Sequence, residues 1–501
     1  MRLYGLNQFG LNSDEAVYAG QAAGLAGFTQ FAHLFGIFRA HPLLVQLVIS
    51  VVFRAAGVHG LLARDVCVVF GVGLVLATGL AAGVISGRWA ALIAMLFVAL
   101  SPYAVAISRQ VLLDGPEACF VGIYLVFLIL YLQRMRAIWL WSAALAAGLA
   151  FLSKETAILL APAFLISLML TPKVPLRRRD LLIAGLIYLV AVVIYPLAEL
   201  GAGRGGTGTD YIIWQLLRPP NHTLLFYFEV LGAIGWPLVA FAVVGAWVAI
   251  GRRTATDVAL LTLTGVLLAF FELWPTKGYE YLMPLVPPLV LLAISGVTYC
   301  GSLASRHLGH PARLARWVTA PRATAALVVV VVGLLVGTAG PTLAADSAPG
   351  AVIIGTDSGQ VTPARVSALA GSGGLLAGRP TAEWARKRTL PDSVFLTIGP
   401  SFANILEFYS LRRALALSVS PNPLHRNPAY APVVNADQLI RSGAVQYLVY
   451  DAYSAARTSH FANRLLQLAH RFDGILVYRY VAAPHGRARQ PSLVLVYQVR
   501  P

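Results

Sequence analysis

The chain has 501 residues, of which 58% are hydrophobic and only 12% are charged. A soluble domain carries about 25% charged residues, so this composition excludes an ordinary soluble protein and indicates a polytopic α-helical membrane protein. Lysine and arginine outnumber aspartate and glutamate by 38 to 21, but they punctuate apolar runs instead of gathering on one soluble segment, which argues against nucleic-acid binding.

The first segment, residues 1–60, is too polar to be a membrane span. It carries the adjacent carboxylates Asp14 and Glu15, and its apolar run 43–53 is shorter than the roughly 20 residues that a span requires. We expect an extracytoplasmic loop with short helices along the membrane surface.

A transmembrane domain over residues 61–343 is predicted from the succession of apolar runs that follows. About ten spans are expected, with boundaries accurate to a few residues. Their predicted positions are 61–86, 89–108, 115–133, 137–153, 157–171, 181–200, 224–250, 257–275, 281–303 and 323–343.

The loops between these runs predict the topology, because cytoplasmic loops are enriched in arginine and lysine. Every second loop carries arginine, as at Arg88, Arg134, Arg177, Arg252 and Arg306. The alternate loops should therefore face outward together. They contain Asp14/Glu15, Arg109/Asp114, Lys154/Glu155, residues 201–222 and the turn 274–280. We expect a multi-pass protein of the plasma (inner) membrane with this side extracytoplasmic.

Residues 344–501 form a separate predicted unit, an extracytoplasmic α/β domain, because short strand-like runs alternate with helical patterns. The predicted strands are 393–398, 446–450, 475–481 and 492–499, and the predicted helices are 381–389, 401–411 and 458–472. Ten spans would also place Met1 outside, although no signal peptide precedes it. We therefore expect that a first span is missing from this sequence.

Asp14 and Glu15 are the first candidates for chemistry. A carboxylate on the outer surface can take the proton of an attacking hydroxyl or orient that hydroxyl. The alternative is structural: Asn12 or Ser13 caps a helix, and acids are favoured in its first turn. The sequence leaves both interpretations open.

Three further turns carry charge between apolar runs. Arg109 and Asp114 are unusual in a lipid-flanked turn, where ionisable residues are expensive, although they are also able to pair with each other. Lys154 offers a point charge for a phosphate, or a partner for Glu155. Lys277 and Tyr281 open a later span, where tyrosine also serves as an interfacial anchor.

Together these segments resemble the polyprenyl-phosphate-sugar-dependent glycosyltransferases with the C-type membrane fold, above all the protein O-mannosyltransferase and aminoarabinose transferase group of glycosyltransferase family 39. The matching stretches are Asp14-Glu15, the Ser-Arg-x-x-Leu-Leu-Asp pattern of 108–114, the Gly-Leu-Ala…Lys pattern of 148–154, and His41-Pro42, where Leu43 replaces a second proline. The resemblance covers roughly residues 10–300.

The resemblance implies transfer of a mannose-like or arabinose-like sugar, with inversion, from a polyprenyl-phosphate donor to an acceptor hydroxyl of a cell-envelope glycan, lipid or protein. It implies that Asp14 acts as the base or positions the acceptor. We also predict catalytic roles for Glu15 and Asp114, and substrate binding by His41, Arg109, Lys154, Lys277 and Tyr281. No cofactor is certain. A divalent metal is possible, although no His/Cys constellation requires one.

Two other classes remain open. A transporter or flippase of lipid-linked sugars would use outward ionisable groups for translocation, but no two-fold internal repeat is visible. A non-catalytic membrane scaffold would bind partners through its outer domain, and the acid pair argues weakly against that class.

Overall fold

The computed structural model describes residues 2–7, 10–171, 177–308, 377–482 and 492–500, together with helical positions 329, 332 and 333. The tenth predicted span, 323–343, lies almost entirely outside these ranges. The predicted boundary between residues 343 and 344 lies outside them as well.

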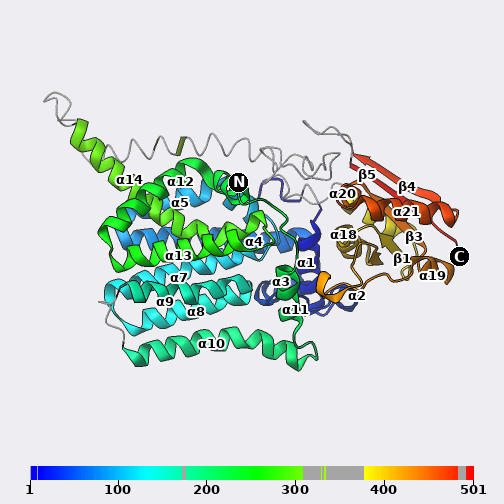
Figure 1. The fold of residues 1–501 in the computed structure, drawn as a ribbon, viewed down its shortest axis with the longest axis horizontal. Coiled ribbons are helices and arrows are strands. Elements are labelled where there is room, and N and C mark those ends of the chain that lie inside the picture. Colours follow the sequence, from blue (N-terminus) through cyan, green and yellow to red (C-terminus); the bar gives the residue numbers. More distant parts are fainter. Residues whose placement is uncertain are drawn as a thin grey trace.

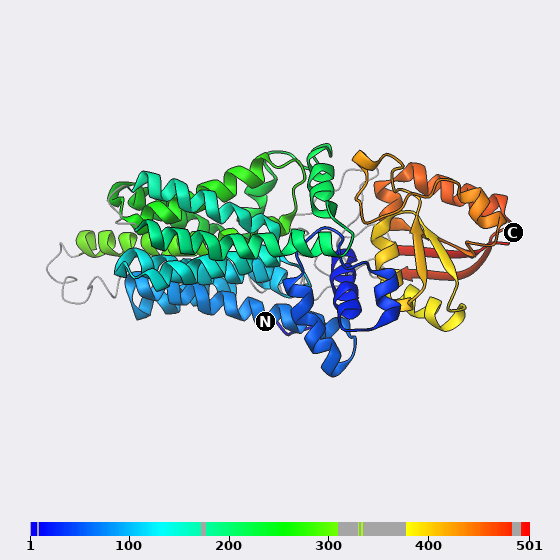
Figure 2. The same cartoon turned by 90° about the horizontal axis from the view of Figure 1, so that it is seen from below.

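A helical bundle occupies one end of the molecule and a small sheet with its helices occupies the other, while the N-terminal helices lie between them (Figures 1 and 2). These N-terminal helices are α1 (Ser13–Leu25), α2 (Thr29–Leu34) and α3 (Leu44–Ala56). Short helices were predicted in this segment. In α3, Val45, Ile49 and Phe53 are spaced by four residues and fully buried, so one apolar stripe packs the helix against its neighbours.

Helices are present at the other nine predicted spans. The bundle consists of α4 (Gly60–Ser86), α5 (Arg88–Leu100), α6 (Pro102–Ser108), α7 (Asp114–Arg134), α8 (Ala137–Ser153), η1 (Glu155–Leu159), α9 (Leu160–Leu170), α10 (Arg178–Gly201), α12 (Phe226–Arg252), α13 (Ala255–Leu273), η2 (Tyr279–Leu285) and α14 (Val286–Leu308). A short helix, α11 (Thr207–Leu216), follows α10.

Length and composition allow six of the described helices to cross a membrane, or seven if the bent pair α5–α6 counts as one span. The bend of 65° explains why the predicted span 89–108 is broken. Ser101 accepts a hydrogen bond from the Ala104 N–H and donates one to the Ile234 carbonyl, and Pro102 begins the next helix. Proline lacks the N–H that a continuous helix would use there.

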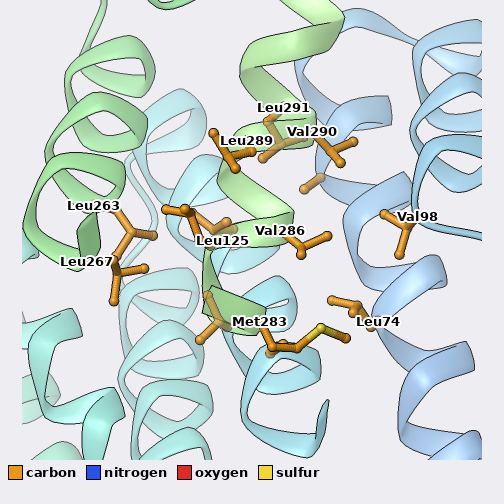
Figure 3. Close-up of a cluster of buried hydrophobic side chains, with 14 of the residues drawn as sticks. Leu74, Val98, Leu125, Leu263, Leu267, Met283, Val286, Leu289, Val290 and Leu291 are labelled. Carbon is orange, nitrogen blue, oxygen red and sulfur yellow. The ribbon is translucent and has the colours of Figure 1, made fainter. Parts of the chain in front are cut away.

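The bundle core is built around η2 and α14. Met283, Val286 and Val290 are fully buried, and Figure 3 shows them among Leu74 and Leu125 and neighbouring apolar side chains. Because α14 is covered on most sides, it is apolar all round rather than along one stripe.

The C-terminal sheet has five strands in the order β2-β1-β3-β5-β4. These are β1 (Val394–Thr397), β2 (Arg413–Ala416), β3 (Tyr447–Asp451), β4 (Ile475–Ala482) and β5 (Ser492–Gln498). β1 is parallel to β2 and β3, whereas β5 is antiparallel to β3 and β4. All four predicted strands are present, and only the four-residue β2 was missed.

The helices of this region are α17 (Gly378–Arg388), α18 (Pro400–Ser410), α19 (Ala436–Arg441), α20 (Ala452–Arg457) and α21 (Ser459–Arg471). α17, α18 and α21 correspond to the three predicted helices. α18 also joins the two ends of the molecule, because Ile405 and Phe408 are buried in the same apolar cluster as α1, α2 and α3.

Candidate active site

The turn that opens α1 separates the two adjacent carboxylates. Asn12 caps the helix: its side chain accepts from the Glu15 N–H, and the Glu15 carboxylate accepts from the Asn12 N–H. Glu15 is fully buried, forms an ion pair with Arg64 at 2.6 Å and accepts a 3.0 Å hydrogen bond from the Val111 N–H. The capping alternative therefore describes Glu15, while Asp14 lines a cavity.

This cavity has a volume of about 550 Å³. Each of the five segments predicted to face outward together contributes to its wall, so their convergence is confirmed. The membrane side on which it opens remains a prediction. The ionisable lining groups are Asp14, Tyr18, His41, Asp114, Lys154, Glu155, Tyr195, Glu199, Tyr211, Glu280 and Tyr281. Apolar groups complete the wall, including Leu112, Phe151, Ile158, Phe270, Phe271 and Trp274.

A buried ion pair at the cavity wall joins two of the predicted site residues. The Lys154 Nζ lies 2.6 Å from the Asp114 Oδ1, and both side chains are more than nine-tenths buried. Asp114 is the first residue of α7, and Lys154 follows the last residue of α8 with extended backbone. The ammonium also lies 4.2 Å from the ring centroid of Tyr281, a cation–π contact. Lys154 is thus held rigidly with one face toward the cavity.

Asp14 has the environment of a base. Its side chain is exposed to the cavity, but the protein around the cavity limits its hydration and so raises the pKa of the carboxyl above the ordinary value. The nearby His41 and Lys154 oppose this change, while Asp114 and Glu15 add to it. A carboxylate with a raised pKa holds a captured proton more strongly than an exposed one does. The role of Asp14 as a base for an acceptor hydroxyl remains a prediction.

His41 lines the cavity and contacts Glu155, with 2.8 Å between Nδ1 and Oε2. Its ring meets the edges of Tyr18 and Tyr211, at centroid distances of 6.0 and 5.0 Å. Lys154 and Glu155, adjacent in sequence, therefore have different partners, Asp114 and His41.

Two predicted substrate-binding residues are placed elsewhere. Neither Arg109 nor Lys277 is among the described residues that line the cavity. Arg109 is buried at the end of α6, and Lys277 forms an ion pair with Glu272 at 2.7 Å. Their roles in substrate binding remain predictions.

Sequence reasoning assigned no role to several carboxylates near this site. Glu155 and Glu280 line the cavity, and Glu117 accepts a 2.7 Å hydrogen bond from the Thr156 hydroxyl. Glu117 lies three positions after Asp114, so helical spacing alone places both on one face of α7. The sequence could therefore have identified Glu117 as a neighbour of Asp114 from this spacing. Within the described residues, no group of three or more His, Cys, Asp or Glu side chains is arranged to hold a metal ion.

Comparison with known proteins supports the family resemblance that the sequence indicated. Residues 40–196 match the family model for dolichyl-phosphate-mannose-protein mannosyltransferase. No curated protein sequence gives a significant match.

Solved structures match almost the whole chain. Apo ArnT from Cupriavidus metallidurans has a TM-score of 0.68 at 17% identity, with 99% of this chain and 95% of that one covered. The same protein bound to undecaprenyl phosphate gives 0.65 at 17% identity over the same shares. The apo oligosaccharyltransferase of Archaeoglobus fulgidus gives 0.58 at 15% identity, with 95% of this chain and 70% of that one covered. The predicted resemblance is therefore confirmed: the chain has the fold of the C-type membrane glycosyltransferases, and residues 40–196 match the mannosyltransferase family model.

Proposed function

We propose that the protein is a membrane glycosyltransferase that moves a sugar from a polyprenyl-phosphate donor to an acceptor hydroxyl. The observation that carries this proposal is the placement of Asp14 and the Lys154–Asp114 pair in one cavity. A base for the acceptor and a cation for the departing phosphate are the two groups that such a transfer requires. The undecaprenyl phosphate bound to the similar ArnT supports the donor class.

In the proposed reaction the acceptor oxygen attacks the anomeric carbon of the sugar while the bond from that carbon to the phosphate oxygen breaks. Asp14 takes the acceptor proton. Polyprenyl phosphate leaves with the bonding electron pair, and Lys154 stabilises the growing negative charge. The apolar wall formed by Phe270, Phe271 and Trp274 suits the first part of the lipid tail.

The remaining cavity residues position these two groups. Asp114 and Tyr281 hold Lys154, and Glu155 holds His41 at the cavity wall. Glu15 fixes the first turn of α1 through Asn12 and Arg64, so its contribution to Asp14 is indirect. We assign the substrate-contacting roles to Asp14, Lys154 and His41.

The test uses purified protein, radiolabelled polyprenyl-phosphate mannose or arabinose, and a membrane extract as the source of acceptor. Asp14→Asn should lower kcat by about 100-fold or more, the contribution of a positioned base, while the affinity for undecaprenyl phosphate stays unchanged. Asp65→Asn is the matched control, because it makes the same change at a half-buried position of α4 outside the cavity wall.

Wild-type protein that is folded but neither binds undecaprenyl phosphate nor transfers or hydrolyses either sugar would refute the proposal. Equal activity of Asp14→Asn and wild type would remove Asp14 as the base.

A further inference from the structure

Three hollows in the protein are neighbours that share lining residues. A cleft of about 1060 Å³ lies between α2 and the C-terminal sheet region. It shares Arg39 and Tyr430 with a narrow neck of about 70 Å³, and the neck shares Asp14 and His41 with the 550 Å³ cavity. The three hollows therefore lie in series between the cleft and the proposed base, apart from the apolar wall on which the lipid tail is placed.

Arg39 lines both the cleft and the neck, and one N–H group of its guanidinium lacks a hydrogen-bond acceptor in the part of the chain that the structure describes. Its side chain is 9% exposed, and its buried Nη1 has no hydrogen-bond partner among the described residues. The guanidinium lies 4.9 Å from the ring centroid of Tyr430, whose hydroxyl accepts a hydrogen bond from Asn404. A buried donor without a partner costs free energy, and a ligand anion would remove that cost with a charge-assisted hydrogen bond.

The charges around the cleft favour an anion. Besides Arg39, the charged lining residues are Arg386, Arg412, Arg413, Asp392 and Glu407, and His33 also lines the wall. Arginine thus exceeds acid along the wall. Glu407 lies close enough to Arg39 and Arg413 to interact with their charges, and one of its carboxylate oxygens accepts a 3.0 Å hydrogen bond from the Ala414 N–H. Burial raises the pKa of Glu407 to about 7, which weakens its negative charge near neutral pH.

We propose that this cleft is the acceptor site, and that the acceptor carries a phosphate or carboxylate group held by Arg39 while its hydroxyl reaches Asp14 through the neck. This inference rests on the proposed glycosyl transfer and names the acceptor class. The neck has room for only a few water molecules. The acceptor hydroxyl is therefore carried by a narrow substituent, such as a hydroxymethyl group, a short distance from the anionic group of the acceptor.

The experiment separates the membrane extract into neutral and anionic fractions by anion exchange and supplies each as acceptor. Label should enter the anionic fraction. Arg39→Gln should raise the KM for that fraction at least about tenfold, the loss expected for one charge-assisted hydrogen bond, while the affinity for undecaprenyl phosphate is unchanged. Arg54→Gln, at an exposed arginine of α3, is the matched control and should behave as wild type.

A second arm does not require turnover. In native mass spectrometry, Asp14→Asn protein incubated with the anionic fraction should retain an anionic component that the Asp14→Asn, Arg39→Gln double variant loses. Phosphatase treatment of the fraction beforehand abolishes retention of a phosphate ester and spares a carboxylate.

Label that enters only the neutral fraction, or unchanged KM and retention in the Arg39→Gln variants, would overturn the inference while leaving the proposed transfer standing. Failure of wild type to bind undecaprenyl phosphate would instead count against the transfer. Retention that depends on Arg39 would still identify the anion site in that case.

Discussion

At the scale of single residues, the first turn of α1 gives two neighbouring carboxylates different surroundings. Glu15 points into the protein toward Arg64 and the Val111 N–H, whereas Asp14 borders the cavity. One residue corresponds to 100° of rotation around a helix, so adjacent side chains face different directions. The same rotation accounts for an Asp-Glu pair in which one acid borders the cavity and the other holds the helix turn in place.

Glu15→Ala should lower the stability of the folded protein by about 3–5 kcal/mol, because the buried Arg64 guanidinium loses its counter-charge and keeps only neutral partners such as the Leu6 and Gly10 carbonyls. Thermal unfolding in detergent measures this loss. Glu383→Ala removes one partner of the exposed Arg379–Glu383 pair and should cost less than about 1 kcal/mol. A Glu15→Ala protein that is as stable as wild type but inactive would return Glu15 to the catalytic role predicted from the sequence.

The sequence identified the residues of this cavity better than it identified which of them contact each other. Asp14, His41, Asp114, Lys154 and Tyr281 were all identified from charge and motif, and all five line the cavity. The partner of Asp114 was not predictable in the same way. Local spacing suggested Arg109, five positions away, whereas the ion pair in the structure joins Asp114 to Lys154, forty positions later. Such a contact depends on how α7 and α8 pack, which no local pattern encodes.

At the scale of elements, two glycines allow α12 and α14 to pack closely. A Cβ added to Gly245 of α12 would lie 1.8 Å from the Leu292 carbonyl oxygen, and one added to Gly296 of α14 would lie 2.1 Å from the Phe241 carbonyl oxygen. The two backbones are therefore in direct contact, the arrangement that small residues permit between membrane helices.

Gly245→Ala should force α12 and α14 apart and destabilise the protein by about 1–3 kcal/mol, the usual cost of overpacking. Gly251→Ala in the same helix is the control, since nothing lies within 4 Å of its added Cβ, and alanine favours a helix by up to about 1 kcal/mol over glycine. The two melting temperatures should therefore move in opposite directions. A Gly245→Ala variant as stable as wild type would show that the helices do not meet this closely.

Helices and strands were predictable where the pattern of hydrophobic residues determines them. Apolar runs located nine helical positions and alternation located four strands, because burial selects the side chains on those faces. The break at Ser101 was not predictable, since it depends on a hydrogen bond to Ile234 in α12. The four residues of β2 carry too little pattern to be recognised, and β2 is defined by its register against β1.

At the scale of the whole molecule, the N-terminal helices connect the bundle to the sheet region. Phe408 of α18 is buried against Phe31, with ring centroids 5.5 Å apart, in the cluster that also holds α1 and α3. Two polar contacts lie beside it: the Tyr409 hydroxyl accepts from the Leu11 N–H, and the Asn404 amide donates to the Ser13 hydroxyl. The helix that carries Asp14 is thus attached to a region near the C-terminal end of the chain.

Phe408→Ala should cost about 3–5 kcal/mol at this contact and loosen α1 more than the sheet. Hydrogen exchange measures both regions separately: protection should fall in α1 and α2 and persist in β1 and β3. Phe402→Ala, on the same helix but buried against the sheet, should show the reverse pattern. Equal loss of protection in both variants and both regions would mean that the two clusters unfold as one unit.

The hydrogen bond between Asn404 and Ser13 has a consequence for the timing of biogenesis. Ser13, which precedes the proposed base, forms this bond with a residue nearly 400 positions later in the chain, so the bond can form only after that residue has been synthesised. At a synthesis rate of about 5–20 residues per second, that interval lasts roughly 20–80 seconds. For most of this interval Lys154 and Asp114 have been synthesised, whereas the turn that carries Asp14 still lacks its contact with α18. If the proposed transfer is right, the site reaches its final geometry only after the C-terminal region has been synthesised.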